Sequence, residues 1–112
     1  SDMITGCPIP QPILNRETKL IKLDRIIASK FSIISNKNLP SLSPKAKRIF
    51  KHLLIHFEKI TSNDDKENRL KNIFDKYDFV LVRPDLYVYG GCDLENISNV
   101  IESLEDKFFL KL

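Results

Sequence analysis

Two pairs of side chains in this 112-residue sequence have the chemistry of a functional site, and the first is a pair of histidines. His52 and His56 are four residues apart, so on a helix they would share one face and could bind a metal ion with further ligands. No third ligand stands at a matching spacing. On a strand, at about 3.3 Å per residue, they would lie roughly 13 Å apart and could not share one ion. We therefore expect no metal site.

The second pair, Arg83 and Asp85, flanks a proline and could bind an anion or act in catalysis. Pro84 and Asp85 favour the two central positions of a type I turn over residues 83–86. In such a turn Asp85 can accept backbone N–H groups, and Arg83 can reach an acidic partner across a domain contact. We expect structural rather than catalytic roles for this motif, which also includes Tyr87.

The cysteines and glycines argue against two further chemistries. Cys7 and Cys92 form no C-x-x-C motif, so the sequence indicates neither a thiol redox pair nor a zinc site, and we expect two reduced thiols. Gly6, Gly90 and Gly91 do not form the G-x-G-x-x-G motif that holds a dinucleotide phosphate between a strand and a helix. We expect no catalytic, cofactor-binding or metal-binding residue in this chain.

Positive charge is concentrated in one part of the chain. Residues 15–51 contain ten Lys and Arg against two acidic residues, whereas residues 52–112 contain eight against twelve. RNA-binding aromatic motifs and a helix-turn-helix glycine turn are missing, so we expect no nucleic-acid partner, but a solvated face or one that docks to an acidic neighbour. No apolar run approaches the roughly 20 residues of a membrane span, and we expect a cytoplasmic protein without a membrane partner.

Prolines and apolar spacing predict the first elements. Pro8, Pro10 and Pro12 favour an extended arm over residues 1–18, whose first residues we interpret as a cloning remnant. A short strand or helical turn is expected around Asp24, followed by a core strand over 31–35.

Ser43 and Pro44 form a helix start, with serine as the cap and proline in the first turn. The end of that helix is ambiguous. Periodicity favours one continuous helix through residue 60, but residues 53–60 also read as a buried strand.

A second amphipathic helix, a hairpin and a third helix complete the pattern. The second helix has its apolar face at Leu70, Ile73, Phe74 and Tyr77, and the hairpin joins 79–82 to 87–89. Asp93 is expected to cap the third helix. Its apolar stripe is Leu94, Ile97, Val100, Ile101, Leu104 and Phe108, and Phe109, Leu110 and Leu112 are expected to contact a neighbouring domain or chain.

With 53–60 as a strand, the elements follow the order of the thioredoxin-like α/β fold. The right-handed crossover then sets the first two core strands parallel, and the hairpin adds two antiparallel strands. The sequence thus predicts a four-stranded mixed sheet with helices on both faces over residues 19–112, preceded by the proline-rich arm.

Three motifs, found in this order along the chain, resemble the C-terminal thioredoxin-like domain of FAD-dependent aromatic hydroxylases. The first is the proline-rich arm, and the second is Leu23-Asp24 ahead of Phe31-Ser32-Ile33-Ile34. The third and most specific is Val80-Leu81-Val82-Arg83-Pro84-Asp85 followed by Tyr87-Val88. Tyr87-Val88-Tyr89-Gly90 is more similar to the 3-(3-hydroxyphenyl)propionate hydroxylase branch than to the phenol hydroxylase branch of these flavoprotein monooxygenases.

The resemblance implies a non-catalytic accessory domain that serves domain packing or dimerisation. FAD and NAD(P)H would then be bound by the parent chain, with upstream FAD and substrate domains as partners and a homodimer as a further option. It also favours a strand over 53–60. Disulfide exchange is expected to be absent, because the segment 36–44 has no cysteine and Asp78 stands where active thioredoxins have a cis-proline. The alternative is a free-standing module whose basic face binds protein or nucleic acid.

Overall fold

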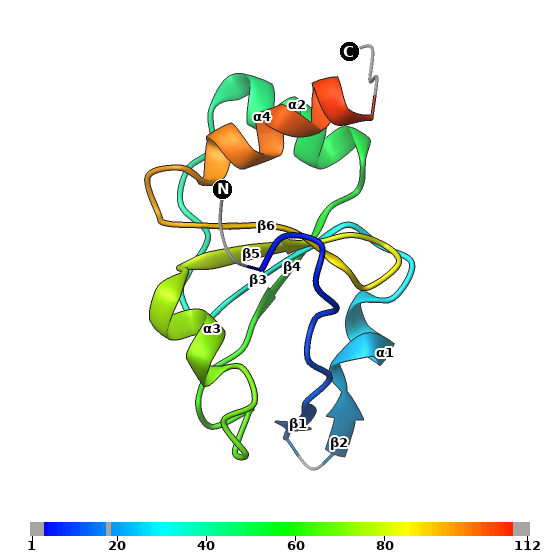
Figure 1. The fold of residues 1–112 in the computed structure, drawn as a ribbon, viewed down its shortest axis with the longest axis vertical. Coiled ribbons are helices and arrows are strands. Elements are labelled where there is room, and N and C mark those ends of the chain that lie inside the picture. Colours follow the sequence, from blue (N-terminus) through cyan, green and yellow to red (C-terminus); the bar gives the residue numbers. More distant parts are fainter. Residues whose placement is uncertain (1–3, 18, 109–112) are drawn as a thin grey trace.

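The computed structural model describes residues 4–17 and 19–108 (Figure 1). Its elements are β1 (Ile13–Arg16), β2 (Lys19–Lys22), α1 (Leu23–Ile27), β3 (Ser32–Ser35), α2 (Pro44–His52), β4 (His56–Lys59), α3 (Lys71–Lys76), β5 (Phe79–Val82), β6 (Val88–Cys92) and α4 (Ile97–Lys107). The expectations for residues 1–3 and for Phe109, Leu110 and Leu112 fall outside the described residues. Within the described ranges, no helix is long and apolar enough to cross a membrane.

A four-stranded mixed sheet in the order β4-β3-β5-β6 forms the centre of the molecule. β3 and β4 are parallel, whereas β5 is antiparallel to both β3 and β6. Helices α2 and α4 cover one face, and α1, α3 and the β1–β2 hairpin lie on the other (Figure 1). The predicted thioredoxin-like architecture, with helices on both faces, is confirmed.

Alternation along the central strands divides the apolar core between the two faces of the sheet. Ile33 packs in the core beneath α2 and α4, while its neighbour Ile34 faces the core on the side of α1 and α3. In β5 Leu81 and Val80 divide in the same way, and all four side chains are at most 1% exposed. Successive strand residues point to opposite faces, so β3 and β5 are apolar on both sides.

The end of α2 resolves the helix-or-strand ambiguity. Ser43 caps the helix through its Oγ, which accepts the Ala46 N–H at 3.1 Å. At the other end, the Ile55 N–H donates to the Phe50 carbonyl at 3.0 Å, and Leu54 adopts a left-handed φ of 52°. This six-to-one bond closes the helix. A strand over 56–59 is confirmed, and one continuous helix through residue 60 is wrong.

The proline-rich arm is tied to the sheet rather than lying free. The Gly6 N–H donates to the Val88 carbonyl and the Val88 N–H donates to the Cys7 carbonyl, each at 2.8 Å. Farther along, the residues assigned to the end of the arm form β1, which pairs with β2 in an antiparallel hairpin. The expected boundary after residue 18 therefore falls between two paired strands.

The start of the last helix differs from the prediction. α4 begins at Ile97 with Asn96 as its cap, whereas Asp93 accepts the Asn96 N–H at 3.1 Å in a preceding turn. Asp93 therefore stabilises this turn and does not cap the helix. Leu94 consequently lies outside the helix and is 48% exposed.

Gly91 in β6 is required by a close contact with a side chain. A Cβ atom at this position would lie 2.8 Å from the ring of Tyr77. The strand therefore accepts no larger residue without displacement of that ring.

Candidate functional site

The turn at residues 83–86 is built as the sequence predicts. The Leu86 N–H donates to the Arg83 carbonyl at 2.9 Å, which closes the turn. The carboxylate of Asp85 accepts the Tyr87 N–H at 3.2 Å and forms an ion pair with the Arg83 guanidinium. Both ends of this ion pair are more than 40% exposed, so it contributes little to stability.

This turn also receives two other segments of the chain. The Ile9 N–H of the arm donates to the Leu86 carbonyl at 2.9 Å, and Pro8 forms a β-bridge with Tyr87. From the loop after α1, the Ser29 N–H donates to the Pro84 carbonyl at 3.2 Å. The motif therefore lies where the arm, the loop after α1 and the hairpin meet.

The loop after β3 is where thioredoxin-like enzymes place the reactive thiol, at a helix N-terminus that lowers the thiol pKa. Here Asp78, the residue before β5, fixes this loop. The Ser35 hydroxyl donates to the Asp78 carbonyl at 2.5 Å, and the Lys37 ammonium binds the Asp78 carboxylate at 2.7 Å. The Leu94 N–H donates to the same carboxylate at 2.8 Å. The Lys37 ammonium first, and the Leu94 N–H after it, hold the pKa of the Asp78 carboxyl below its ordinary value of 3.8.

Ser43 occupies the N-terminus of α2, the position at which such a thiol would act. Besides capping its own helix, its hydroxyl donates to the Glu102 carboxylate at 2.6 Å, and its N–H donates to the Ser98 hydroxyl at 3.0 Å. Ser43 therefore joins the start of α2 to α4.

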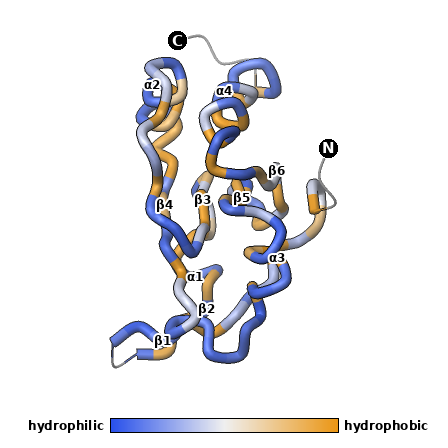
Figure 2. The backbone as a smooth tube through the Cα atoms, turned by 90° about the vertical axis from the view of Figure 1, so that its left-hand side faces the viewer, coloured by the Kyte–Doolittle hydropathy of each residue, from blue (hydrophilic) through white to orange (hydrophobic). Residues whose placement is uncertain are grey.

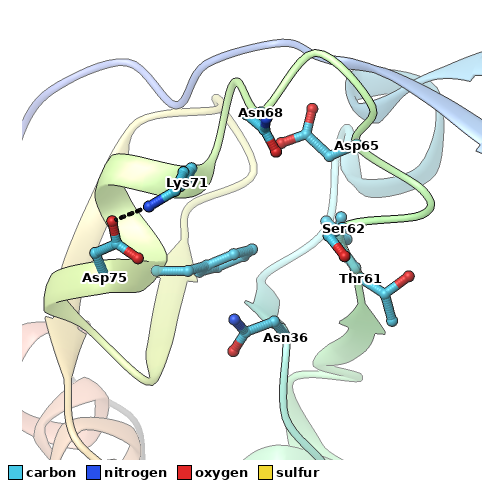
Figure 3. Close-up of a pocket in the computed structure, with 9 residues that line it drawn as sticks. Asn36, Thr61, Ser62, Asp65, Asn68, Lys71 and Asp75 are labelled. Atoms are coloured by element: carbon cyan, nitrogen blue, oxygen red, sulfur yellow. Dashed lines mark hydrogen bonds and ion pairs between the residues drawn. The ribbon is translucent and has the colours of Figure 1, made fainter.

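A small cleft lies beside the loop after β3, close to the carboxyl ends of β3 and β4 (Figure 3). Its volume is about 140 Å³. The carboxylate of Asp65 accepts the backbone N–H groups of Arg69 and Leu70, at 3.1 and 2.8 Å. Lys71 pairs with Asp75 at 2.7 Å on the same wall. The charged groups of the cleft are thus already bonded within the protein.

The small cleft does not fit a flavin dinucleotide, because ligand sites usually measure about 300–1,000 Å³. A wider groove of about 580 Å³ lies between β6 and α4, but the helical residues that line it, Val100, Ser103 and Lys107, come from the body and end of α4. The helix N-terminus that would receive a pyrophosphate does not face this groove.

The two histidines lie on different elements. His52 ends α2, whereas His56 begins β4 and its Nε2 lies 2.6 Å from the Glu58 carboxylate. Glu58 also pairs with Arg16 at 2.7 Å, which connects β4 to the β1–β2 hairpin. In the part of the chain that the structure describes, no three His, Cys, Asp or Glu side chains are grouped as metal ligands.

Neither Cys7 nor Cys92 forms a disulfide, which agrees with the predicted reduced thiols. Cys7 is exposed on the arm, whereas Cys92 is buried in β6.

Sequence reasoning missed the structural role of Asp78 and the exposed Leu54. Asp78 is 43 residues from Ser35, and no local pattern reveals that pairing. Leu54 stands between apolar neighbours in the sequence, and nothing there indicates its left-handed backbone.

The fold and these sites define a thioredoxin-like α/β domain. At the usual position of the reactive thiol it has Ser43, whose hydroxyl caps α2 and donates to Glu102. The chain belongs to a family described as the HcaD C-terminal domain, whose family model matches residues 6–107. This membership agrees with the resemblance to the C-terminal domain of aromatic hydroxylases and makes the chain an accessory domain of the aromatic-degradation oxidoreductase type. No curated protein matches the chain.

Proposed function

We propose that this chain is the non-catalytic C-terminal accessory domain of an FAD-dependent aromatic-ring monooxygenase. Family membership over residues 6–107 supports a C-terminal accessory domain. The observation that carries the proposal is the attachment of the arm to the family-like hairpin, through Ile9 to Leu86 and through the bridge between Pro8 and Tyr87. FAD and NAD(P)H act in the upstream part of such an enzyme.

The arm explains how the domain would serve domain packing. Its backbone is bonded to β6 at Val88, and Ile9 is only 3% exposed in the core on the α1 side. A polypeptide that precedes the arm is therefore held in a fixed orientation to the sheet, because several bonds must break together before the arm can swing.

The experiment begins with the coding sequence upstream of Met3. The full polypeptide and the 112-residue chain are purified separately, and flavin absorbance and NAD(P)H oxidation with a phenolic substrate are measured for both. We expect flavin and substrate-stimulated oxidation in the full polypeptide only. A folded full polypeptide with neither property would remove the proposal. A start codon at Met3 with no upstream frame would instead support a free-standing interaction module.

A further inference from the structure

The exposed flank of α2 carries positive charge that is not neutralised within the described part of the chain. The helix contains Lys45, Lys47, Arg48, Lys51 and His52 and no acidic residue. Lys45 pairs with Glu105 of α4 at 3.5 Å, but Lys47, Arg48 and Lys51 form no ion pair with any described residue. Lys47 and Lys51 are four residues apart on one flank, where like charges destabilise a helix.

Leu54 follows the helix and is unfavourable for two separate reasons. Its φ of 52° lies in the left-handed region, where a side chain is strained and glycine is the usual residue after a helix. Leu54 is also 81% exposed, more than any other large hydrophobic residue among those that the structure describes. A glycine would satisfy the same backbone bonds without either cost.

These features meet at one groove. It measures about 390 Å³ and is lined by Lys30, Phe50, Lys51, Leu54, Ile55 and His56. Lys47 lies one turn before Lys51 on α2, and Lys51 lines the groove together with Leu54, which follows the helix end at His52. The surface thus combines an apolar floor with a basic margin.

We propose that this surface, the α2 face (Lys47, Phe50, Lys51, Leu54 and Ile55), docks an acidic segment of a second protein. Carboxylates of that segment pair with Lys47 and Lys51, and an apolar side chain packs on Phe50 and Leu54. Two features that are unfavourable in the free domain become favourable in this complex.

The position of the α2 face favours a separate polypeptide over the upstream part of the same chain. The arm joins the sheet at β6, whereas α2 leads into β4, and these strands are the two opposite edges of the sheet. Figure 2 shows this arrangement, with α2 and β4 on one side and β6 on the other. A domain that directly precedes the arm therefore approaches at the β6 edge.

The test uses a fluorescein-labelled peptide in which a pair of leucines is flanked by runs of glutamate, titrated with the 112-residue protein. Replacing Leu54→Gly should weaken binding about tenfold or more, the effect of losing one buried leucine. Lys47→Gln with Lys51→Gln should weaken it similarly and reduce its salt dependence. The matched controls are Leu20→Gly, a leucine 73% exposed on β2, and Lys19→Gln with Lys22→Gln, and these should leave binding unchanged.

Thermal unfolding separates loss of docking from loss of the fold. Leu54→Gly should raise Tm by roughly 5 °C, because glycine relieves the left-handed strain at a helix end. Leu54→Asn should also lose binding while remaining folded, since asparagine tolerates this conformation. The proposal fails if the wild-type protein does not bind the peptide, if either substitution leaves binding unchanged, if the Leu54 variants unfold at lower temperature, or if a single-stranded oligonucleotide displaces the peptide.

Discussion

The carboxylate of Asp78 gives the most direct test of the contacts that fix the loop after β3. Asp78→Asn keeps the shape of the side chain but removes the charge that pairs with Lys37. Because Lys37 is 50% exposed, we expect this substitution to lower the free energy of unfolding by about 0.5–1 kcal/mol. Asp78→Ala also removes the acceptor of the Leu94 N–H, which adds about 1 kcal/mol.

The effect of Asp78→Asn depends on pH in a defined direction. The pKa of Asp78 is lower in the folded protein than its ordinary value of 3.8, so the unfolded state binds the proton more readily. Its stabilising contribution is therefore complete above pH 3.8 and is lost as pH falls through the folded pKa. The difference in free energy of unfolding between wild type and Asp78→Asn should be present at pH 7 and should disappear in stronger acid.

Urea unfolding at several pH values measures this difference. At neutral pH we expect the midpoint of Asp78→Asn to fall by about 0.5 M urea. Asp75→Asn is the matched control, since Asp75 also pairs with a lysine but is 57% exposed, and its effect should be smaller. A double-mutant cycle with Lys37→Gln isolates the pair. An equal loss for Asp78→Asn in acid and at neutral pH, or no coupling to Lys37, would refute the reasoning.

Three further substitutions test other parts of the fold by urea or thermal unfolding. Ser43→Ala should lower the free energy of unfolding by about 1–2 kcal/mol, because it removes the cap of α2 and the bond to α4. Ser41→Ala, at an exposed serine, is its control, and equal effects of the two substitutions would contradict this role. Gly91→Ala should cost about 1–3 kcal/mol through overlap with Tyr77, and an unchanged midpoint would refute the clash. Asp85→Ala should lower stability by at most about 1 kcal/mol at this exposed turn; unchanged melting with lost parent activity would instead indicate a functional role.

The order of elements was predictable where a local signal marks each boundary. Ser43 and Pro44 start α2, and Pro84 with Asp85 forms the turn before β6, because their side chains restrict the backbone directly. The central strands were located by short apolar runs, such as Phe79 to Val82 in β5, because β3 and β5 are buried on both faces.

Elements without such signals were missed. β1 pairs with β2 as far as Arg16 and Lys19, the sequence between these residues contains no glycine, proline or asparagine, and Glu17 takes a φ of 53°. The end of α2 was ambiguous for the same reason, because Leu54 occupies the position where glycine would have marked a helix end. Asp93 gave a misleading signal, since an acceptor before an apolar stripe can serve a turn as well as a helix.

The candidate site was the least predictable part because its members are distant in sequence. In the loop that leads from β3 to α2, Lys37 and Leu94 donate to the carboxylate of Asp78, and Ser35 donates to its carbonyl. At the N-terminus of α2, where a thioredoxin-like enzyme carries its thiol, Ser43 connects α2 to α4. A substrate entering this corner would have to displace bonds that hold together β3, β5 and the two helices. The loop after β3 and the N-terminus of α2 therefore stabilise the fold, which accords with an accessory role. The C-terminal end of α2 is left for the proposed docking.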